Sequence, residues 1–171
     1  AMAAGYSAGG TPPTIVYTAD IFDREALDLC VEHGIHVNCG SPDMIDQLGA
    51  RAPGRHITLR INPGFGHGHS RKTNTGGPLS KHGIWHEDLE DALARAARHG
   101  LSVTGLHLHI GSGVDMRHLS QVAEAACELA RRVGPGLHAI SAGGPFALPF
   151  RWPPTRRWHR VRGSARASAR R

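Results

Sequence analysis

Four histidines in two closely spaced pairs are the first candidates for metal chemistry: His67 with His69, and His107 with His109. Residues two apart on a strand share one face, so His107 and His109 could both ligate a metal ion. No acidic or cysteine partner stands at a recognisable spacing, and His67 and His69 belong to a glycine-rich loop where solvated histidines are common. The sequence therefore predicts no metal site. It favours His109 as a single inward ring that stacks on a planar ligand.

Glycines and small polar residues stand at the ends of predicted strands. Gly111-Ser112-Gly113 precedes a predicted helix, so free backbone N–H groups and the Ser112 hydroxyl could point at an anion. Gly143 and Gly144 would let the backbone approach a phosphate in the same way. Neither segment is a Walker loop or a G-x-G-x-x-G motif. Because ligands bind at the carboxyl ends of parallel strands, these residues indicate an anion or cofactor site there.

The elements that must position these groups alternate along the first 145 residues. Apolar runs predict strands over 15–17, 35–39, 56–61, 103–110 and 137–142. Helical spacing predicts helices over 23–33, from Ser41 onward, from Trp85 to Ala96, and from Asp115 to Val133. Five strands joined by crossovers predict a parallel sheet with helices outside it. This α/β arrangement is either an open doubly wound sheet or about five units of a (β/α)8 barrel, whose full length is about 250 residues.

The net charge of +6 comes from the end of the chain. Residues 151–171 hold eight arginines and no Asp, Glu or Lys; removing these eight leaves 12 basic against 14 acidic residues, a net of −2. We predict a folded domain over 1–150 and a disordered, Arg-rich tail over 151–171. The tail is either an arm for nucleic acid, with Trp152 and Trp158 for stacking, or an out-of-frame product of translation. The abrupt change in composition favours the second interpretation.

Composition argues against several other classes of protein. The three cysteines, Cys30, Cys39 and Cys127, form no C-x-x-C pair, which disfavours disulfide frameworks and zinc fingers. No stretch approaches the roughly 18 apolar residues of a membrane helix. The first residues show no secretory pattern. These features predict a cytoplasmic protein with no membrane partner.

Longer motifs follow one another in a fixed order up to about residue 144. They are residues 37–41 (VNCGS), 43–49, 59–70 (LRINPGFGHGHS), 72–77 (KTNTGG), 80–85 (SKHGIW), 105–113 (GLHLHIGSG) and 140–144 (ISAGG). Together they resemble the bacterial diaminopimelate decarboxylases. The resemblance implies an alanine-racemase-like barrel that binds pyridoxal 5'-phosphate and acts as a homodimer with a separate β domain. The implied reaction is decarboxylation of meso-diaminopimelate, a small-molecule amino acid, to L-lysine.

The same resemblance implies roles for individual residues. His109 corresponds to the histidine that stacks on the pyridoxal ring. Ser112 and the turn at 143–144 (Gly-Gly) correspond to phosphate contacts, and Gly111 belongs with them. Arg60 and His82 are expected to line the site less directly.

The sequence also departs from the family pattern. Its two lysines, Lys72 and Lys81, lie in motifs other than the one that carries the Schiff-base lysine. Pro145 stands where the family has a third glycine and has no N–H to give a phosphate. We therefore expect this polypeptide alone to be inactive. The alternatives are a related amino-acid decarboxylase of the same fold, or a basic-tailed nucleic-acid-binding protein; we expect no specific nucleic-acid partner.

Overall fold

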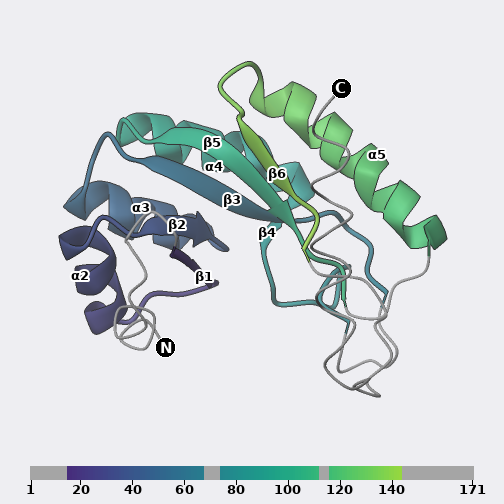
Figure 1. Ribbon diagram of the computed structural model, residues 1–171, viewed down its shortest axis with the longest axis horizontal. Helices are drawn as coiled ribbons and strands as arrows, with labels where there is room; N and C mark the ends of the chain where they lie inside the picture. The colour runs from purple at the N-terminus through teal and green to yellow at the C-terminus, as the bar shows by residue number, and fades with distance from the viewer. Residues whose placement is uncertain (1–14, 68–73, 112–115, 144–171) are drawn as a thin grey trace, which may run out of the picture.

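The computed structural model describes residues 15–67, 74–111 and 116–143 (Figure 1). The elements are, in chain order, β1 (Val16–Ala19), α2 (Arg24–Glu32), β2 (His36–Cys39), α3 (Pro42–Arg51), β3 (His56–Asn62), β4 (Ile84–Trp85), the 3-10 turn η2 (His86–Asp88), α4 (Leu89–Arg98), β5 (Ser102–Leu108), α5 (Met116–Val133) and β6 (Ala139–Ser141). The predictions for Ser112, Asp115, Gly144 and the tail at 151–171 lie outside the described residues.

Helices α2 and α3 begin where the sequence places capping residues. Asp23 accepts a hydrogen bond from the backbone N–H of Ala26 at 2.7 Å, and Ser41 accepts one from the N–H of Met44 at 3.4 Å. Pro42 occupies the first turn of α3, where its missing N–H would have had no helical partner. The structure thus confirms both predicted helix starts.

The sheet has the strand order β1-β2-β3-β5-β6, and each neighbouring pair is parallel. This sequential order arises when successive βα units are laid side by side, each helix returning the chain to the start of the next strand. The prediction of a partial (β/α)8 barrel of about five parallel units is confirmed. Among the described residues, β1 and β6 each pair along one edge only.

A short strand, β4, was not predicted. It pairs in parallel with the end of β3, at Ile61 and Asn62. Because Ile61 also pairs with Leu108 of β5, β4 must lie on the opposite edge of β3, in line with β2. The helix predicted from Trp85 is found but begins later, because Trp85 pairs with Asn62 as a strand residue. A 3-10 turn follows, and α4 starts only at Leu89.

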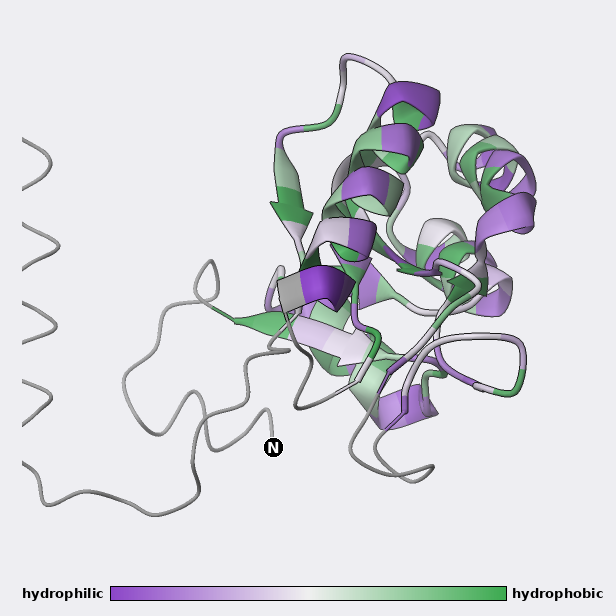
Figure 2. Ribbon diagram, turned by 90° about the vertical axis from the view of Figure 1, so that its right-hand side faces the viewer, coloured by the Kyte–Doolittle hydropathy of each residue, from purple (hydrophilic) through white to green (hydrophobic). Residues whose placement is uncertain are grey.

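The two faces of the sheet differ in chemistry because successive side chains on a strand point in opposite directions. Apolar side chains face the helices and are buried: Val37, Cys39, Ile57, Leu59, Ile61, Leu106, Leu108 and Ile110. The register places polar side chains on the other face: Thr18, His36, Asn38, Thr58, Arg60 and His107. Figure 2 shows the helices gathered on one side of the strands. We call the polar face, which looks away from the helices, the inner face.

Asn62, at the end of β3, anchors the loop that leads to β4. Its side-chain oxygen accepts hydrogen bonds from the N–H groups of Gly64 at 3.1 Å and Gly77 at 2.9 Å, and its amide donates to the Gly77 carbonyl at 3.0 Å. Asn62 is buried, so water does not compete for these bonds. The anchored loop brings the segment before β4 to the carboxyl ends of the strands.

Candidate functional site

A row of polar side chains crosses the inner face near the carboxyl ends of the strands. The β3–β5 register sets Arg60 beside His107, and the β5–β6 register sets His107 beside Ser141. His109 follows two residues after His107, and their rings are 6.4 Å apart and nearly parallel, at 15°. The prediction that residues 107 and 109 share one face is therefore confirmed.

His107 is held by a buried partner from another strand. Its Nδ1 lies 2.7 Å from the amide nitrogen of Asn38, which is only 3% exposed. An amide nitrogen can only donate, so Nδ1 is the acceptor and the ring is neutral. Burial, followed by the charges of Arg60 and His109, lowers the pKa of His107 from 6.5 to about 4. At neutral pH this ring is therefore an uncharged part of the inner face.

His109 has a buried polar atom without a hydrogen-bond partner in the described part of the chain, and the backbone of Gly143 lies close to its ring. Its Nδ1 is buried without a hydrogen-bond partner among the described residues. Burial, then the charges of Arg60 and His82, lower its pKa below the usual value. Gly143 has φ +73°, and a Cβ there would overlap His109 Nδ1 and lie 3.0 Å from the carbonyl oxygen of Leu108. Only glycine fits beside the His109 ring at this position.

Asp20, just after β1, joins the ends of several elements. One carboxylate oxygen, Oδ1, accepts hydrogen bonds from the Gly83 N–H at 3.1 Å and from the Arg60 guanidinium at 3.4 Å. The other oxygen, Oδ2, lies 2.5 Å from His82 Nδ1. We call Asp20, Arg60 and His82 the strand-end cluster. It places the Arg60 guanidinium and the His82 ring near His109, and the guanidinium can bind an anionic ligand.

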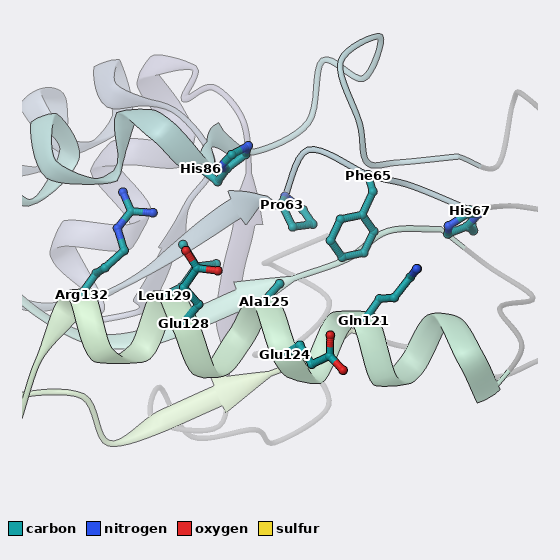
Figure 3. Close-up of a pocket in the computed structure, with 10 residues that line it drawn as sticks. All are labelled: Pro63, Phe65, His67, His86, Gln121, Glu124, Ala125, Glu128, Leu129 and Arg132. Carbon is teal, nitrogen blue, oxygen red and sulfur yellow. The ribbon is translucent and has the colours of Figure 1, made fainter.

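Cavities open on both sides of this region. One of about 570 Å³ lies against the strand-end cluster and is lined by Asp20, Ser41, Lys81, His82 and Trp85, among others. A second, of about 450 Å³, lies between α5 and the loop after β3. Figure 3 shows its lining, with Glu124 and Glu128 on α5 and Phe65 on the facing loop. The second cavity contains none of the predicted site residues.

The structure brings some predicted site residues together and not others. His109 and Gly143 are in contact distance of each other, and Arg60 and His82 meet through Asp20. Gly111 is buried and forms an antiparallel bridge with Asn74, so it stabilises the adjoining loop. Of the glycine and serine residues predicted to hold an anion, Ser112 and Gly144 are outside the described ranges.

Two residues of the site were not singled out in advance. They are Asp20 and Asn38. The signal that could have found them is their place at the ends of neighbouring parallel strands. Their partners, however, lie 40 to 69 positions further along the chain, and one sequence does not reveal such contacts.

The histidines considered for metal binding have other surroundings. The His67 ring stacks on His118 of α5 at a centroid distance of 3.4 Å, whereas His69 is not described. Within the described ranges, no three His, Cys, Asp or Glu side chains gather closely enough to hold a metal ion. Among the same residues, no helix is both long and apolar enough to cross a bilayer.

Comparisons with known proteins place these features in a family. Residues 1–160 match the model of the pyridoxal-dependent decarboxylases, over the part described as the pyridoxal binding domain. The chain is 58% identical over 150 residues to the diaminopimelate decarboxylase of Streptomyces coelicolor, a match that covers 88% of this chain and 34% of that protein. For the Escherichia coli enzyme of the same name the identity is 53% over 150 residues, covering 88% and 36%.

A solved structure agrees with these matches. A crystal structure of a diaminopimelate decarboxylase resembles this fold with a TM-score of 0.78 at 48% identity, and the match covers 97% of this chain and 40% of that one. The chain thus spans about a third of the length of the curated relatives it matches.

Proposed function

The chain belongs to the pyridoxal-dependent decarboxylases, and we propose that it forms the pyridoxal 5'-phosphate-binding part of an enzyme that decarboxylates meso-diaminopimelate to L-lysine. The high identity to diaminopimelate decarboxylases supports this substrate over that of a related amino-acid decarboxylase. Action as a homodimer in the cytoplasm belongs to the same proposal. The matches above favour a decarboxylase over the nucleic-acid-binding alternative.

The pairing of His109 with Gly143 is the observation that supports the cofactor best. A neutral aromatic ring suits stacking on a planar heterocycle, and burial together with the charges of Arg60 and His82 keeps the pKa of His109 low. Its buried, unpartnered Nδ1 leaves one polar atom still to be satisfied. The missing side chain of Gly143 lets its backbone approach that atom closely. These residues fit a flat cofactor.

The surrounding residues have separable tasks. When bound, pyridoxal phosphate supplies the electron sink that decarboxylation requires. His109 would stack on its ring, Arg60 would place its positive charge beside an anionic ligand with His82 next to it, and Ser112 and Gly144 remain the proposed phosphate contacts. Asn38 fixes the His107 ring, which is next to Arg60 in the register. These residues bind and orient the ligand, and a covalent link needs a lysine at another position.

Lysine chemistry sets the expected behaviour of the 171-residue chain. Lys81 is exposed on the wall of the cavity beside the strand-end cluster, and Lys72 is not described. By family resemblance neither is the lysine that links the cofactor. We therefore propose that this chain binds pyridoxal phosphate without a covalent bond and releases no carbon dioxide from diaminopimelate by itself.

The experiment that tests this function measures pyridoxal phosphate binding to the whole chain by fluorescence titration. His109→Ala should weaken binding about fivefold, because a lost stacked face is worth about 1 kcal/mol. The matched control is His56→Ala, since His56 is exposed at the opposite end of β3. Borohydride should trap no site adduct. Equal affinities for the wild type and His109→Ala, or no binding at all, would contradict the proposal.

A further inference from the structure

We propose that Asp20 is a positioning residue of this site: its carboxylate orients the Arg60 guanidinium and the His82 ring beside His109. The inference rests on the proposed function, because the ligand that Arg60 and His82 would meet is the phosphorylated cofactor. Asp20 itself is argued to act through these two side chains, and its contact with them is the observation that carries the inference.

The geometry around Asp20 is specific at each oxygen. Oδ1 is shared between a backbone donor, the Gly83 N–H, and the Arg60 guanidinium, whereas Oδ2 is used by His82 Nδ1. The side chains are mostly shielded, with exposed fractions of 24% for Asp20, 12% for Arg60 and 32% for His82. The contact with His82, at 2.5 Å, is a short hydrogen bond, whereas the contact with Arg60, at 3.4 Å, is longer and weaker.

The backbone around the carboxylate leaves space for it. A Cβ on Gly40, at the end of β2, would overlap Asp20 Oδ1 and lie 2.5 Å from the carbonyl oxygen of Ala19. Gly83 has φ +82°, a conformation that suits glycine and lets its N–H point at Asp20. Gly40 therefore makes room for the Asp20 side chain, and Gly83 supplies a backbone N–H to it.

The contact with Asp20 also fixes the proton on His82. A carboxylate only accepts hydrogen bonds, so the ring nitrogen that faces it, Nδ1, must carry the hydrogen. In the neutral ring Nε2 is then the acceptor. Without Asp20 the ring could rotate and exchange its tautomer. Asp20 thus determines which atom of His82 a ligand meets.

Simple electrostatics and positioning predict opposite effects of removing this carboxylate. Asp20 adds a negative charge to a site for an anionic ligand, so its removal should strengthen binding if charge alone mattered. If Asp20 holds Arg60 and His82 in place, its removal should weaken binding although the site becomes more positive. The sign of the change therefore discriminates between the two.

The test uses the full 171-residue chain with Asp20→Asn and Asp20→Ala. Asp20→Asn keeps an acceptor oxygen for Gly83 and so guards against loss of the fold, which thermal unfolding checks. The matched control is Asp46→Asn, because Asp46 also contacts an arginine and a histidine, Arg95 and His99, but on the helices. Pyridoxal phosphate affinity and the ¹⁵N shifts of the ligand-free His82 ring, at a pH where it is neutral, are measured for each.

We expect Asp20→Ala to weaken pyridoxal phosphate binding about tenfold, the scale of losing a hydrogen bond to a charged group, and Asp20→Asn to weaken it less. The wild type should show the hydrogen on Nδ1 of His82, Asp20→Ala should lose that signature, and Asp46→Asn should change neither property. Unchanged or tighter binding by the Asp20 variants, or a hydrogen on Nε2 in the wild type, would overturn the inference. Failure of the wild type to bind would instead refute the proposed function, while the ligand-free shifts still decide whether Asp20 orients His82.

Discussion

Two clusters in this molecule are built from the same three residue types. The strand-end cluster contains Asp20, Arg60 and His82, and the other, which we call the helix cluster, contains Asp46, Arg95 and His99. Their side chains are exposed to similar degrees, between 12% and 36%. They differ in place: the first joins the ends of strands on the inner face, and the second joins α3 to α4 and the residue after it. The same pairing chemistry can shape a site or connect two helices, depending on where the fold puts it.

The helix cluster shows what the pairing does away from a site. Burial acts to raise the pKa of Asp46, but hydrogen bonds from Arg95 and His99 outweigh it and hold that pKa below 3.8. Arg98 adds a weaker contact at 4.0 Å. None of these groups lines the two cavities described above, so we expect the helix cluster to affect stability and leave ligand binding unchanged.

The largest difference between the clusters should come from the glycine packed against each one. In Gly40→Ala the new Cβ would meet the backbone oxygen of Ala19 as well as Asp20, and we expect a loss of about 2–3 kcal/mol in unfolding free energy. In Gly49→Ala the new Cβ would overlap Cβ and Cγ of His99, which lie next to the backbone, so His99 and the end of α4 must shift. A helical alanine gains up to about 1 kcal/mol over glycine, which offsets part of this cost, so the loss should be smaller than in Gly40→Ala.

Chemical denaturation of both glycine variants measures this difference, and pyridoxal phosphate titration adds a second readout. We expect Gly40→Ala to lose ligand binding and Gly49→Ala to keep it. Equal losses of stability and of binding in the two variants would contradict the view that only the strand-end cluster serves the ligand site.

The stability of the protein should depend on pH in different ranges for the inner face and for the helix cluster. The folded-state pKa of His107 is depressed to about 4, so between pH 6.5 and about 4 the unfolded chain takes up a proton that the folded chain refuses. Stability should therefore be full above pH 6.5 and fall with the pH, by at most about 1.4 kcal/mol per unit, less because the ring is partly exposed. His36 and His109 act in the same direction. Urea denaturation across this range should show a shallower slope for His107→Asn; an unchanged slope would contradict the assignment.

The helix cluster should respond only at lower pH. The Asp46 pKa is lowered, so its contribution is present above pH 3.8 and is lost as the pH falls through the folded-state value. At neutral pH we expect Asp46→Asn to cost about 0.5–1 kcal/mol, since the pairs are partly exposed and screened by solvent. Thermal unfolding at pH 7 and at pH 3 tests this: the difference between wild type and variant should shrink at the lower pH.

The smallest effect should come from a pair that belongs to neither cluster. Asp28 and Arg51 are joined at 2.6 Å with side chains 47% and 52% exposed. We expect Asp28→Asn to change the unfolding free energy by less than about 0.5 kcal/mol. A larger change, measured by the same denaturation assay, would mean that a surface pair matters as much as the helix cluster.

The predictable part of the fold was the local part. The helix starts at Asp23 and Ser41 and the apolar runs of the main strands reflect chemistry between residues close in sequence, and all are found. The start of the fourth helix was placed too early, at Trp85, because its side chain fits a helical repeat. In the structure the backbone of Trp85 pairs with Asn62. A distant partner outweighed the local pattern.

The site was predictable where family motifs named its residues. His109 and Gly143 came from motifs and strand ends, and the structure sets them side by side. Asp20 and Asn38 could not be found in this way, because their roles depend on hydrogen bonds to residues in other elements. The boundary at residue 150 and the nature of the Arg-rich tail stay predictions.

The sequential strand order also bears on how the protein is made. Because β1, β2 and β3 neighbour one another in the order in which they are synthesised, the sheet can grow by one βα unit at a time as the ribosome delivers the chain. We expect the addition of β5 to be the slowest of these steps, since residues 63–101 must emerge before β5 can pair with the free edge of β3. During that interval the edge of β3 lies open to pairing with other nascent chains. Codon choice or chaperone capture in this interval should therefore influence the yield of native protein more than elsewhere in the message.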